Sequence, residues 1–197
     1  MSVEVAEQYE NLAGWFDANR NKGLVERPYL ERVLQHAAPK GRVLDLGCGT
    51  GEPMAAFFIE HGFHVTGIDI APAMVEMAKS RFPQHDWHVG DIRDLDIDGT
   101  FDVVLAWDSF FHLDRDAQRE FIPAAAKRMA KGAMLLFNTG GGDGETFGEM
   151  EGMTFHYASL DAKEYKSLLE KAGMEVIVHA RDDENCGSRT IWLARKK

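Results

Sequence analysis

Cysteine, basic runs and long apolar runs are scarce or absent in this 197-residue chain, and each shortage excludes a class of protein. Its two cysteines, Cys48 and Cys186, form neither a CxxC pair nor a disulfide framework, so we expect free thiols. The net charge is −10 without a run of Lys or Arg, which argues against a nucleic-acid surface. No apolar stretch approaches the roughly 18 to 20 residues of a membrane span, and the first residues lack a signal-peptide pattern. We therefore expect a cytoplasmic protein with no nucleic-acid or membrane partner.

What the chain does contain suits one buried core. At 45% hydrophobic residues over this length, residues 1–197 predict a single domain. We expect residues 1–39 to form a helical cap on a core made by residues 40–197. The cap either covers an edge of the sheet or closes over the edge that holds a ligand.

After residue 40 the predicted elements alternate between strand and helix, which indicates an α/β fold with a largely parallel sheet and right-handed crossovers. The predicted strands are Arg42–Leu46, His64–Ile68, His85–Val89, Asp102–Trp107, Ala133–Asn138, Met174–Ala180 and Thr190–Ala194. The predicted helices are Glu52–Glu60, Ala71–Arg81, Arg115–Ala130, which ends at Lys131 and Gly132, and Ala162–Ala172. The glycine-rich segment from Gly140 to Gly148 predicts a mobile lid, 140–158, over the carboxyl edge of the sheet.

The first strand runs directly into three glycines at alternate positions, Gly47, Gly49 and Gly51. Glycines at a strand exit let backbone N–H groups approach a ligand, at the sheet edge where open α/β folds bind theirs. The dinucleotide pattern G-x-G-x-x-G needs its third glycine at position 52, which is Glu52. A nucleotide-type site is therefore expected, but the dinucleotide fingerprint fits poorly.

Acidic residues follow the next two strands. Asp69 ends the second strand, 22 residues after Gly47, where a carboxylate can accept both hydroxyls of a ribose. Asp91 and Ile92 follow the third strand and offer a side-chain acceptor beside a backbone N–H, the pair that grips the amino edge of an adenine. Their placement behind the glycine turn predicts one nucleoside-binding edge.

From residue 40 to 139 these motifs resemble, in order, those of the class I S-adenosylmethionine-dependent methyltransferases. The resemblance rests on the segments 43–51, 65–69, 90–92, 101–105 and 131–137, of which the first is highly characteristic. It implies a three-layer Rossmann-like sandwich with a seven-stranded sheet whose last strand inserts antiparallel. One departure is Lys131, Gly132 and Ala133, where many relatives carry Pro-Gly-Gly.

The same resemblance implies S-adenosylmethionine as the methyl donor. The side chain of Asp45 and the backbone of Gly47 and Gly49 would then meet its amino-acid end, while Asp69 binds the ribose. The complete predicted cofactor site comprises Asp45, Gly47, Cys48, Gly49, Gly51, Asp69, Ile70, Asp91, Ile92 and Trp107.

Residues after the fourth strand are candidates for the methyl acceptor's side. Trp107 lies either against the sulfonium, since an aromatic face tolerates a cation, or over the apolar core. Asp108 orients an amine of the cofactor or a polar acceptor, and His112 is either a general base or a structural residue. A metal pair of Asp108 and His112 is disfavoured because no further ligands accompany it, so we expect no metal. The predicted acceptor contacts are Tyr9, Trp15, Phe111, His156 and Tyr157.

The resulting prediction is methyl transfer to a small molecule by in-line displacement, in a monomer or homodimer. A nicotinamide-dependent oxidoreductase is the first alternative, but it predicts a glycine at position 52 and a clear catalytic acid or base. A non-catalytic S-adenosylmethionine-binding protein is the second, and the sequence separates it poorly from an enzyme. The sequence does not say whether oxygen, nitrogen, carbon or sulfur is methylated.

Overall fold

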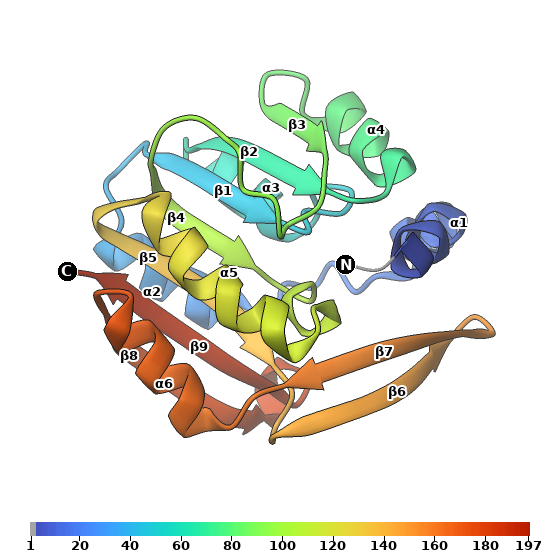
Figure 1. The fold of residues 1–197 in the computed structure, drawn as a ribbon. Coiled ribbons are helices and arrows are strands. Elements are labelled where there is room, and N and C mark those ends of the chain that lie inside the picture. The colour runs from blue at the N-terminus through green and yellow to red at the C-terminus, as the bar shows by residue number, and fades with distance from the viewer. Residues whose placement is uncertain (1–2) are drawn as a thin grey trace.

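A seven-stranded sheet forms the middle layer of the computed structural model, which describes residues 3–197. Its strands are β1 (Arg42–Leu46), β2 (His64–Asp69), β3 (Asp86–Val89), β4 (Phe101–Ala106), β5 (Met129–Thr139), β8 (Met174–Asp183) and β9 (Arg189–Lys196). They lie in the order β3-β2-β1-β4-β5-β9-β8, and β9 runs antiparallel between β5 and β8 (Figure 1). The predicted mostly parallel sheet with an inserted antiparallel strand is therefore confirmed.

Strand β1 lies in the interior of the sheet, with β2 and β4 parallel on either side. Successive side chains of a strand point to opposite faces, so Val43 enters one apolar layer and Leu44 the other, and both are fully buried. Asp45 pairs with Gly67 and Leu105 near the carboxyl ends of these strands. The apolar run thereby carries a carboxyl group to the edge where a ligand can bind.

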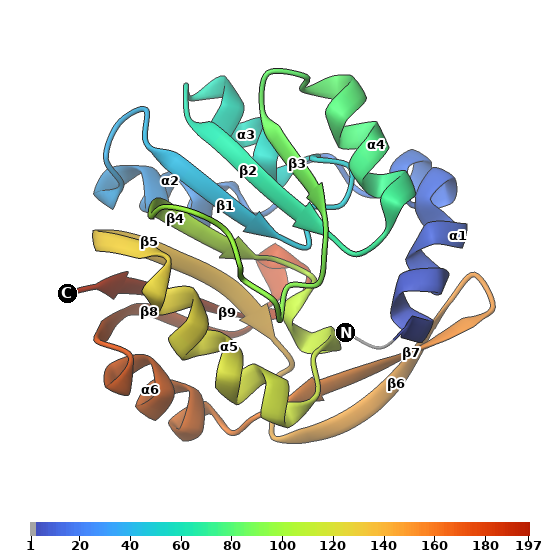
Figure 2. The same cartoon turned by 45° about the horizontal axis from the view of Figure 1, so that its top comes forward.

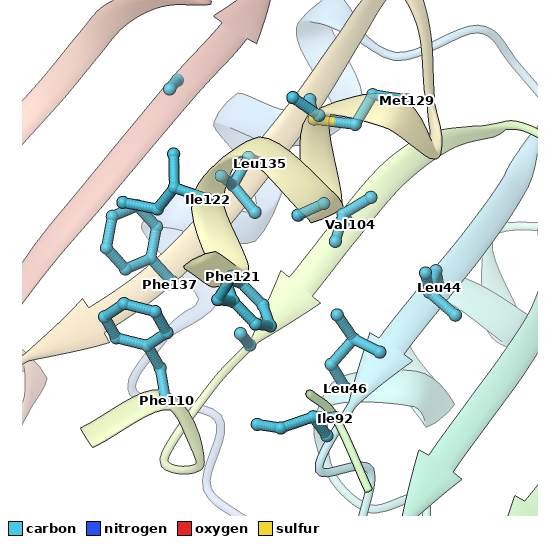
Figure 3. Packing of buried hydrophobic residues seen from close by; sticks show 14 of the residues in the cluster. Leu44, Leu46, Ile92, Val104, Phe110, Phe121, Ile122, Met129, Leu135 and Phe137 are labelled. Atoms are coloured by element: carbon cyan, nitrogen blue, oxygen red, sulfur yellow. The ribbon is translucent and has the colours of Figure 1, made fainter. Parts of the chain in front are cut away.

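Helices cover both faces of the sheet, which gives the predicted three-layer sandwich (Figure 2). They are α2 (Arg27–His36), α3 (Met54–Glu60), α4 (Pro72–Arg81), α5 (Arg115–Lys127) and α6 (Ala162–Lys171). Helices α5 and α6 pack on one face, and α2, α3 and α4 on the other. Figure 3 shows Phe121 and Ile122 of α5 beside Phe137 of β5.

The first helix, α1 (Val3–Asn19), stands apart from these layers, beside α4 (Figure 2). Its Ala13 packs with Ala71 and Met74 of the α4 region. The sequence predicts that the N-terminal segment either covers an edge of the sheet or closes over the edge that holds a ligand. In the structure, α1 lies at the carboxyl edge of the sheet, whereas α2 packs on a sheet face.

The glycine-rich segment after β5 forms a hairpin and not the loop that its composition suggests. Strands β6 (Gly144–Met150) and β7 (Met153–Ser159) pair antiparallel and project from the main sheet (Figure 1). Glycine composition hides this strand because alternate inward positions, such as Gly148 opposite Phe155, need little side-chain volume. The predicted mobility of this lid stays a prediction.

The junction between α5 and β5 also differs from the sequence prediction. Helix α5 ends at Lys127, and β5 begins at Met129, paired with Phe101. Gly132 has a φ of 82° and lies inside the strand, where the register shifts. A left-handed glycine therefore makes a bulge here instead of ending the helix.

Candidate active site

A cavity of about 280 Å³ opens at the carboxyl ends of β1, β2 and β4, beneath α1. It brings together twelve of the predicted site residues: Tyr9, Asp45, Gly47, Cys48, Gly49, Asp69, Ile70, Trp107, Asp108, Phe111, His112 and Tyr157. It is also lined by eight residues outside the predicted site: Phe16, Arg20, Glu52, Met54, Met74, Ser109, Met150 and Arg189.

The glycine turn is built by close backbone packing. The N–H groups of Gly47 and Cys48 donate to the carbonyl of Ile68 at 2.8 and 3.0 Å. Gly47 has a φ of 82°, and a Cβ there would lie 2.2 Å from the Cβ of Ser109. Any other residue at position 47 would displace Ser109, whose hydroxyl donates to the carbonyl of Leu46.

Asp45 is a buried acid with an unused oxygen. Its side chain is 2% exposed, and Oδ2 has no hydrogen-bond partner within residues 3–197. Burial, together with the nearby charge of Asp69, raises the pKa of Asp45 to about 7. A buried carboxyl in this condition is costly without a ligand. It fits the ammonium group of an amino acid, and the Arg20 guanidinium that also lines the cavity suits the carboxylate of the same ligand.

Asp69 is held in place by the glycine turn. Its Oδ2 accepts from the N–H of Gly49 at 2.8 Å, and Oδ1 accepts from the N–H of Ala71 at 3.0 Å. Burial raises the pKa of Asp69, although these backbone bonds act in the opposite direction. Each carboxylate oxygen has a second lone pair that remains for the hydroxyls of a ribose. The residues present therefore fit both ends of S-adenosylmethionine.

Asp108 is the centre of an ion-pair cluster. Arg189 donates to it from Nε and Nη2 at 2.8 and 2.7 Å, and Arg20 donates from Nη1 at 3.1 Å. Asn138 accepts from its N–H at 2.7 Å and donates to its Oδ1 at 2.8 Å. Burial raises the pKa of Asp108, but the arginines and Asn138 outweigh burial and hold it below the usual range. Asp108 therefore stays ionised and anchors two arginines.

This cluster brings together two arginines that the sequence does not connect. Arg189 and Arg20 both contact the carboxylate of Asp108. The two arginines are 169 positions apart in sequence, so no local motif could have shown the pairing.

His112 and Tyr9 form a hydrogen-bonded pair at the wall of the cavity. Tyr9 Oη lies 2.9 Å from His112 Nε2, and His112 Nδ1 lies 3.4 Å from the carbonyl oxygen of His156. The carbonyl can only accept, which assigns the proton to Nδ1 and leaves the Nε2 lone pair for the Tyr9 hydroxyl. Burial lowers the pKa of His112 to about 4 and raises that of Tyr9, so both are neutral.

Aromatic rings surround this imidazole. The ring centroids of Phe111, Tyr157 and Phe155 lie 4.9, 5.1 and 5.7 Å from that of His112. Phe111 and Tyr157 come from two different elements and both line the cavity. The imidazole is therefore held in a largely apolar environment, which suits a neutral base.

Five predicted site residues do not line this cavity. Asp91 accepts two hydrogen bonds from the Arg93 side chain, at 3.0 and 2.7 Å, and Ile92 lies in the core. Trp15 is 39% exposed, and His156 Nε2 lies 2.9 Å from a Glu145 carboxylate oxygen. The remaining residue is Gly51. Their assigned contacts stay predictions.

Two wider searches bear on the site. Within residues 3–197, no group of three or more His, Cys, Asp or Glu side chains is arranged to hold a metal ion. In the same part of the chain, no helix is long and apolar enough to cross a membrane. Cys48 and Cys186 are both free, as predicted.

Comparison with known proteins agrees with this geometry. Residues 43–132 match the family model of the methyltransferase domain. This segment belongs to the methyltransferase-domain family of S-adenosylmethionine-dependent enzymes. A nicotinamide-dependent oxidoreductase is not favoured.

Curated relatives of this methyltransferase chain differ in their acceptors. The chain is 34% identical over 167 residues to 27-O-demethylrifamycin SV methyltransferase of Amycolatopsis mediterranei, covering 77% of this chain and 59% of the relative. It is 30% identical over 147 residues to malonyl-[acyl-carrier protein] O-methyltransferase of Serratia marcescens, covering 68% and 52%. The chain thus spans about half the length of these relatives.

Solved structures share the fold. CalS10, described as an amino pentose methyltransferase from Micromonospora echinaspora with S-adenosylmethionine bound, superposes with a TM-score of 0.73 at 21% identity, covering 100% of this chain and 98% of that one. At this identity the match supports the Rossmann-like methyltransferase fold and no particular acceptor.

Proposed function

We propose that this protein transfers a methyl group from S-adenosylmethionine to a small-molecule acceptor. The observation that carries the proposal is the Asp45 carboxyl, buried beside the glycine turn with one oxygen unpartnered within residues 3–197. Asp45 would accept from the ammonium of the cofactor and Arg20 would donate to its carboxylate. Asp69 would accept from the ribose hydroxyls, and Trp107 would present its indole face to the sulfonium.

Methyl transfer requires the protein mainly to position the acceptor and the methyl donor. The cofactor supplies a methyl group on a sulfonium, whose sulfur keeps the electron pair when its bond to the methyl carbon breaks. The cavity has to align the acceptor with that carbon and exclude water, as the packing of α1 over the carboxyl edge would do. The new bond forms between the acceptor atom and the methyl carbon.

Where the attacking atom is a hydroxyl oxygen, its proton must be transferred to a basic group. The Tyr9 hydroxyl would accept this proton as it gives its own to His112 Nε2, 2.9 Å away. His112 would then hold the proton while its Nδ1–H remains on the His156 carbonyl. Asp108 keeps its charge and positions the arginines.

The partners follow from the same observations. One relative is named for a small acceptor, 27-O-demethylrifamycin SV, and the net charge of −10 is unfavourable for nucleic acid. We propose a cytoplasmic enzyme, monomeric or homodimeric, that works without a metal.

Calorimetric binding of S-adenosylmethionine and S-adenosylhomocysteine tests the cofactor assignment. We expect binding by the wild-type chain and strong weakening in Asp69→Asn, with Asp86→Asn, an exposed acid on β3, as the matched control. Folded protein that binds neither compound would contradict the proposal. Formation of methylated product with an acceptor separates the enzyme from a protein that only binds the cofactor.

A further inference from the structure

A second cavity, of about 600 Å³, lies beside the first. The two cavities share Asp108, Phe111, Tyr157 and Arg189 as wall residues. The second cavity extends along the end of β5 and the β6–β7 hairpin, away from the glycine turn. If the proposed function is correct, an acceptor placed there reaches the cofactor cavity at these four residues.

Hydroxyl and backbone groups dominate the hydrogen-bonding capacity of this wall. The hydroxyl groups of Thr146, Tyr157 and Ser188 line it and have no hydrogen-bond partner within the described residues 3–197. The backbone of residues 140–142 runs along the same wall. These groups can donate and accept alike, as the hydroxyl groups of a ligand require.

The junction of the two cavities has an aromatic side beside the Asp108–Arg189 ion pair. The rings of Phe111 and Tyr157 meet edge to face there, with centroids 5.3 Å apart. A ligand that carries hydroxyl groups on its rim and C–H groups on its faces would match both parts of this cavity.

The charges of the wall exclude an acidic ligand. Each of its carboxylates already has a partner: Asp108 with Arg189, Asp143 with Arg115, and Glu145 with His156. The single arginine in the wall gives both Nε and Nη2 to Asp108. Among the described residues no lining cation is left for a carboxylate or a phosphate, which would instead meet three acids.

We propose that this second cavity binds a hydroxyl-rich, non-acidic acceptor of carbohydrate type. Thr146, Tyr157 and Ser188 hydrogen-bond its hydroxyl groups, and the Phe111 ring packs on its C–H face. The proposal names the acceptor class for the proposed methyl transfer and rests on that function.

Two probes matched in shape and different in charge test it: methyl glucoside and glucuronate. The full chain, saturated with S-adenosylhomocysteine, is titrated with each probe while backbone amide shifts are followed by NMR. We expect methyl glucoside to shift residues 140–142, Thr146 and Ser188 in a saturable way. We expect glucuronate to bind about tenfold more weakly because it meets three carboxylates.

Variants distinguish a specific binding site from nonspecific contact. Thr146→Val and Ser188→Ala should each weaken methyl glucoside binding about fivefold, the effect of one lost hydrogen bond. Glu149→Gln, an exposed change on the same strand β6 and outside the cavity wall, should leave binding unchanged.

Equal or tighter binding of glucuronate, or no methyl glucoside shift at these residues, would overturn the proposal. Failure of the proposed function is visible separately in the same experiment. In that case S-adenosylhomocysteine itself would produce no shifts at Gly47 and Gly49.

Discussion

Asp45 combines two properties that rarely coexist in one side chain. It lies in a strand whose last four residues are buried, and one of its oxygens has no protein partner within residues 3–197. A group of this kind destabilises the ligand-free fold and becomes satisfied when a cation binds. The cost of folding without cofactor and the affinity for cofactor should therefore be linked at this residue.

Asp45→Asn tests this link through pH. Burial raises the pKa of Asp45 from its ordinary value of 3.8 to about 7, so the folded state binds the proton more tightly. Wild-type stability should therefore fall as pH rises from about 4 to about 7, and the variant should lack this component. Thermal unfolding of both cofactor-free proteins across this range measures the difference. Parallel pH curves would contradict it.

The same substitution should weaken cofactor binding. A hydrogen bond to a charged group contributes about 1.5–3 kcal/mol, so we expect Asp45→Asn to raise the dissociation constant of S-adenosylhomocysteine about 10- to 100-fold. Calorimetry measures this directly. Unchanged affinity would mean that the ammonium does not bind at Asp45.

His112 should titrate far below an ordinary histidine. Burial lowers its pKa to about 4, so the imidazole remains neutral throughout the physiological range. NMR titration of its ring, assigned by comparison with His112→Gln, should give a midpoint near 4. A midpoint for His112 at 6 or above would argue against the buried pair with Tyr9.

Individual residues were predictable where a motif places them at a strand end. Asp45, Asp69 and the glycines up to Gly49 reach the cavity because parallel strands end at one edge. Arg20 was not predictable, since it follows α1 and its partner Asp108 is 88 positions away. Such pairing depends on the tertiary path of the chain.

At the scale of elements, Gln118 joins three of them. From α5 its Nε2 donates to the carbonyl of Ala158, at the end of β7, at 2.8 Å and to that of Leu113 at 2.9 Å. Its Oε1 accepts from the hydroxyl of Tyr165 in α6 at 2.5 Å. The side chain is fully buried, and its amide links the hairpin to two helices of the core.

Gln118→Leu should therefore destabilise the fold by about 1–3 kcal/mol, because it leaves buried carbonyl groups without donors. Glu120→Gln, two residues along α5 and exposed, is the control and should change stability by less than about 0.5 kcal/mol. Urea unfolding measures both. Equal stability of the two variants would show that water replaces the amide.

Elements with a clear hydrophobic periodicity match their predictions from the sequence, whereas elements whose conformation depends on strand pairing do not. The buried strand β1 matches its predicted bounds, because four apolar or buried positions in a row leave no alternative. Strand β6 was missed because a partner strand, not its own residues, makes Gly144–Met150 extended. Likewise, the sequence predicts that Gly132 ends a helix, whereas in the structure it forms a bulge in strand β5.

Over the whole molecule, the cluster around Asp108 connects segments that are distant in the chain. Arg20 follows α1, Asn138 belongs to β5, and Arg189 begins β9. Asp108 itself has a φ of 51°, a strained backbone position that these bonds hold. The order of strands was foreseeable from the motifs, but this convergence was not, because it requires the antiparallel strand β9 to lie beside β5.

Arg189→Met should thus be among the more damaging single substitutions. It removes two hydrogen bonds from a largely buried carboxylate, and breaking such a pair typically costs about 3–5 kcal/mol. The double variant Asp108→Asn with Arg189→Met should recover part of that loss, since the carboxylate charge that Arg189 balances is removed as well, and Arg20 keeps Glu26 as a partner. Urea unfolding of the two single variants and the double variant gives the coupling energy. If the losses simply add, then Asp108 is stabilised by Arg20 and Asn138 alone, and Arg189 is free to serve an incoming acceptor.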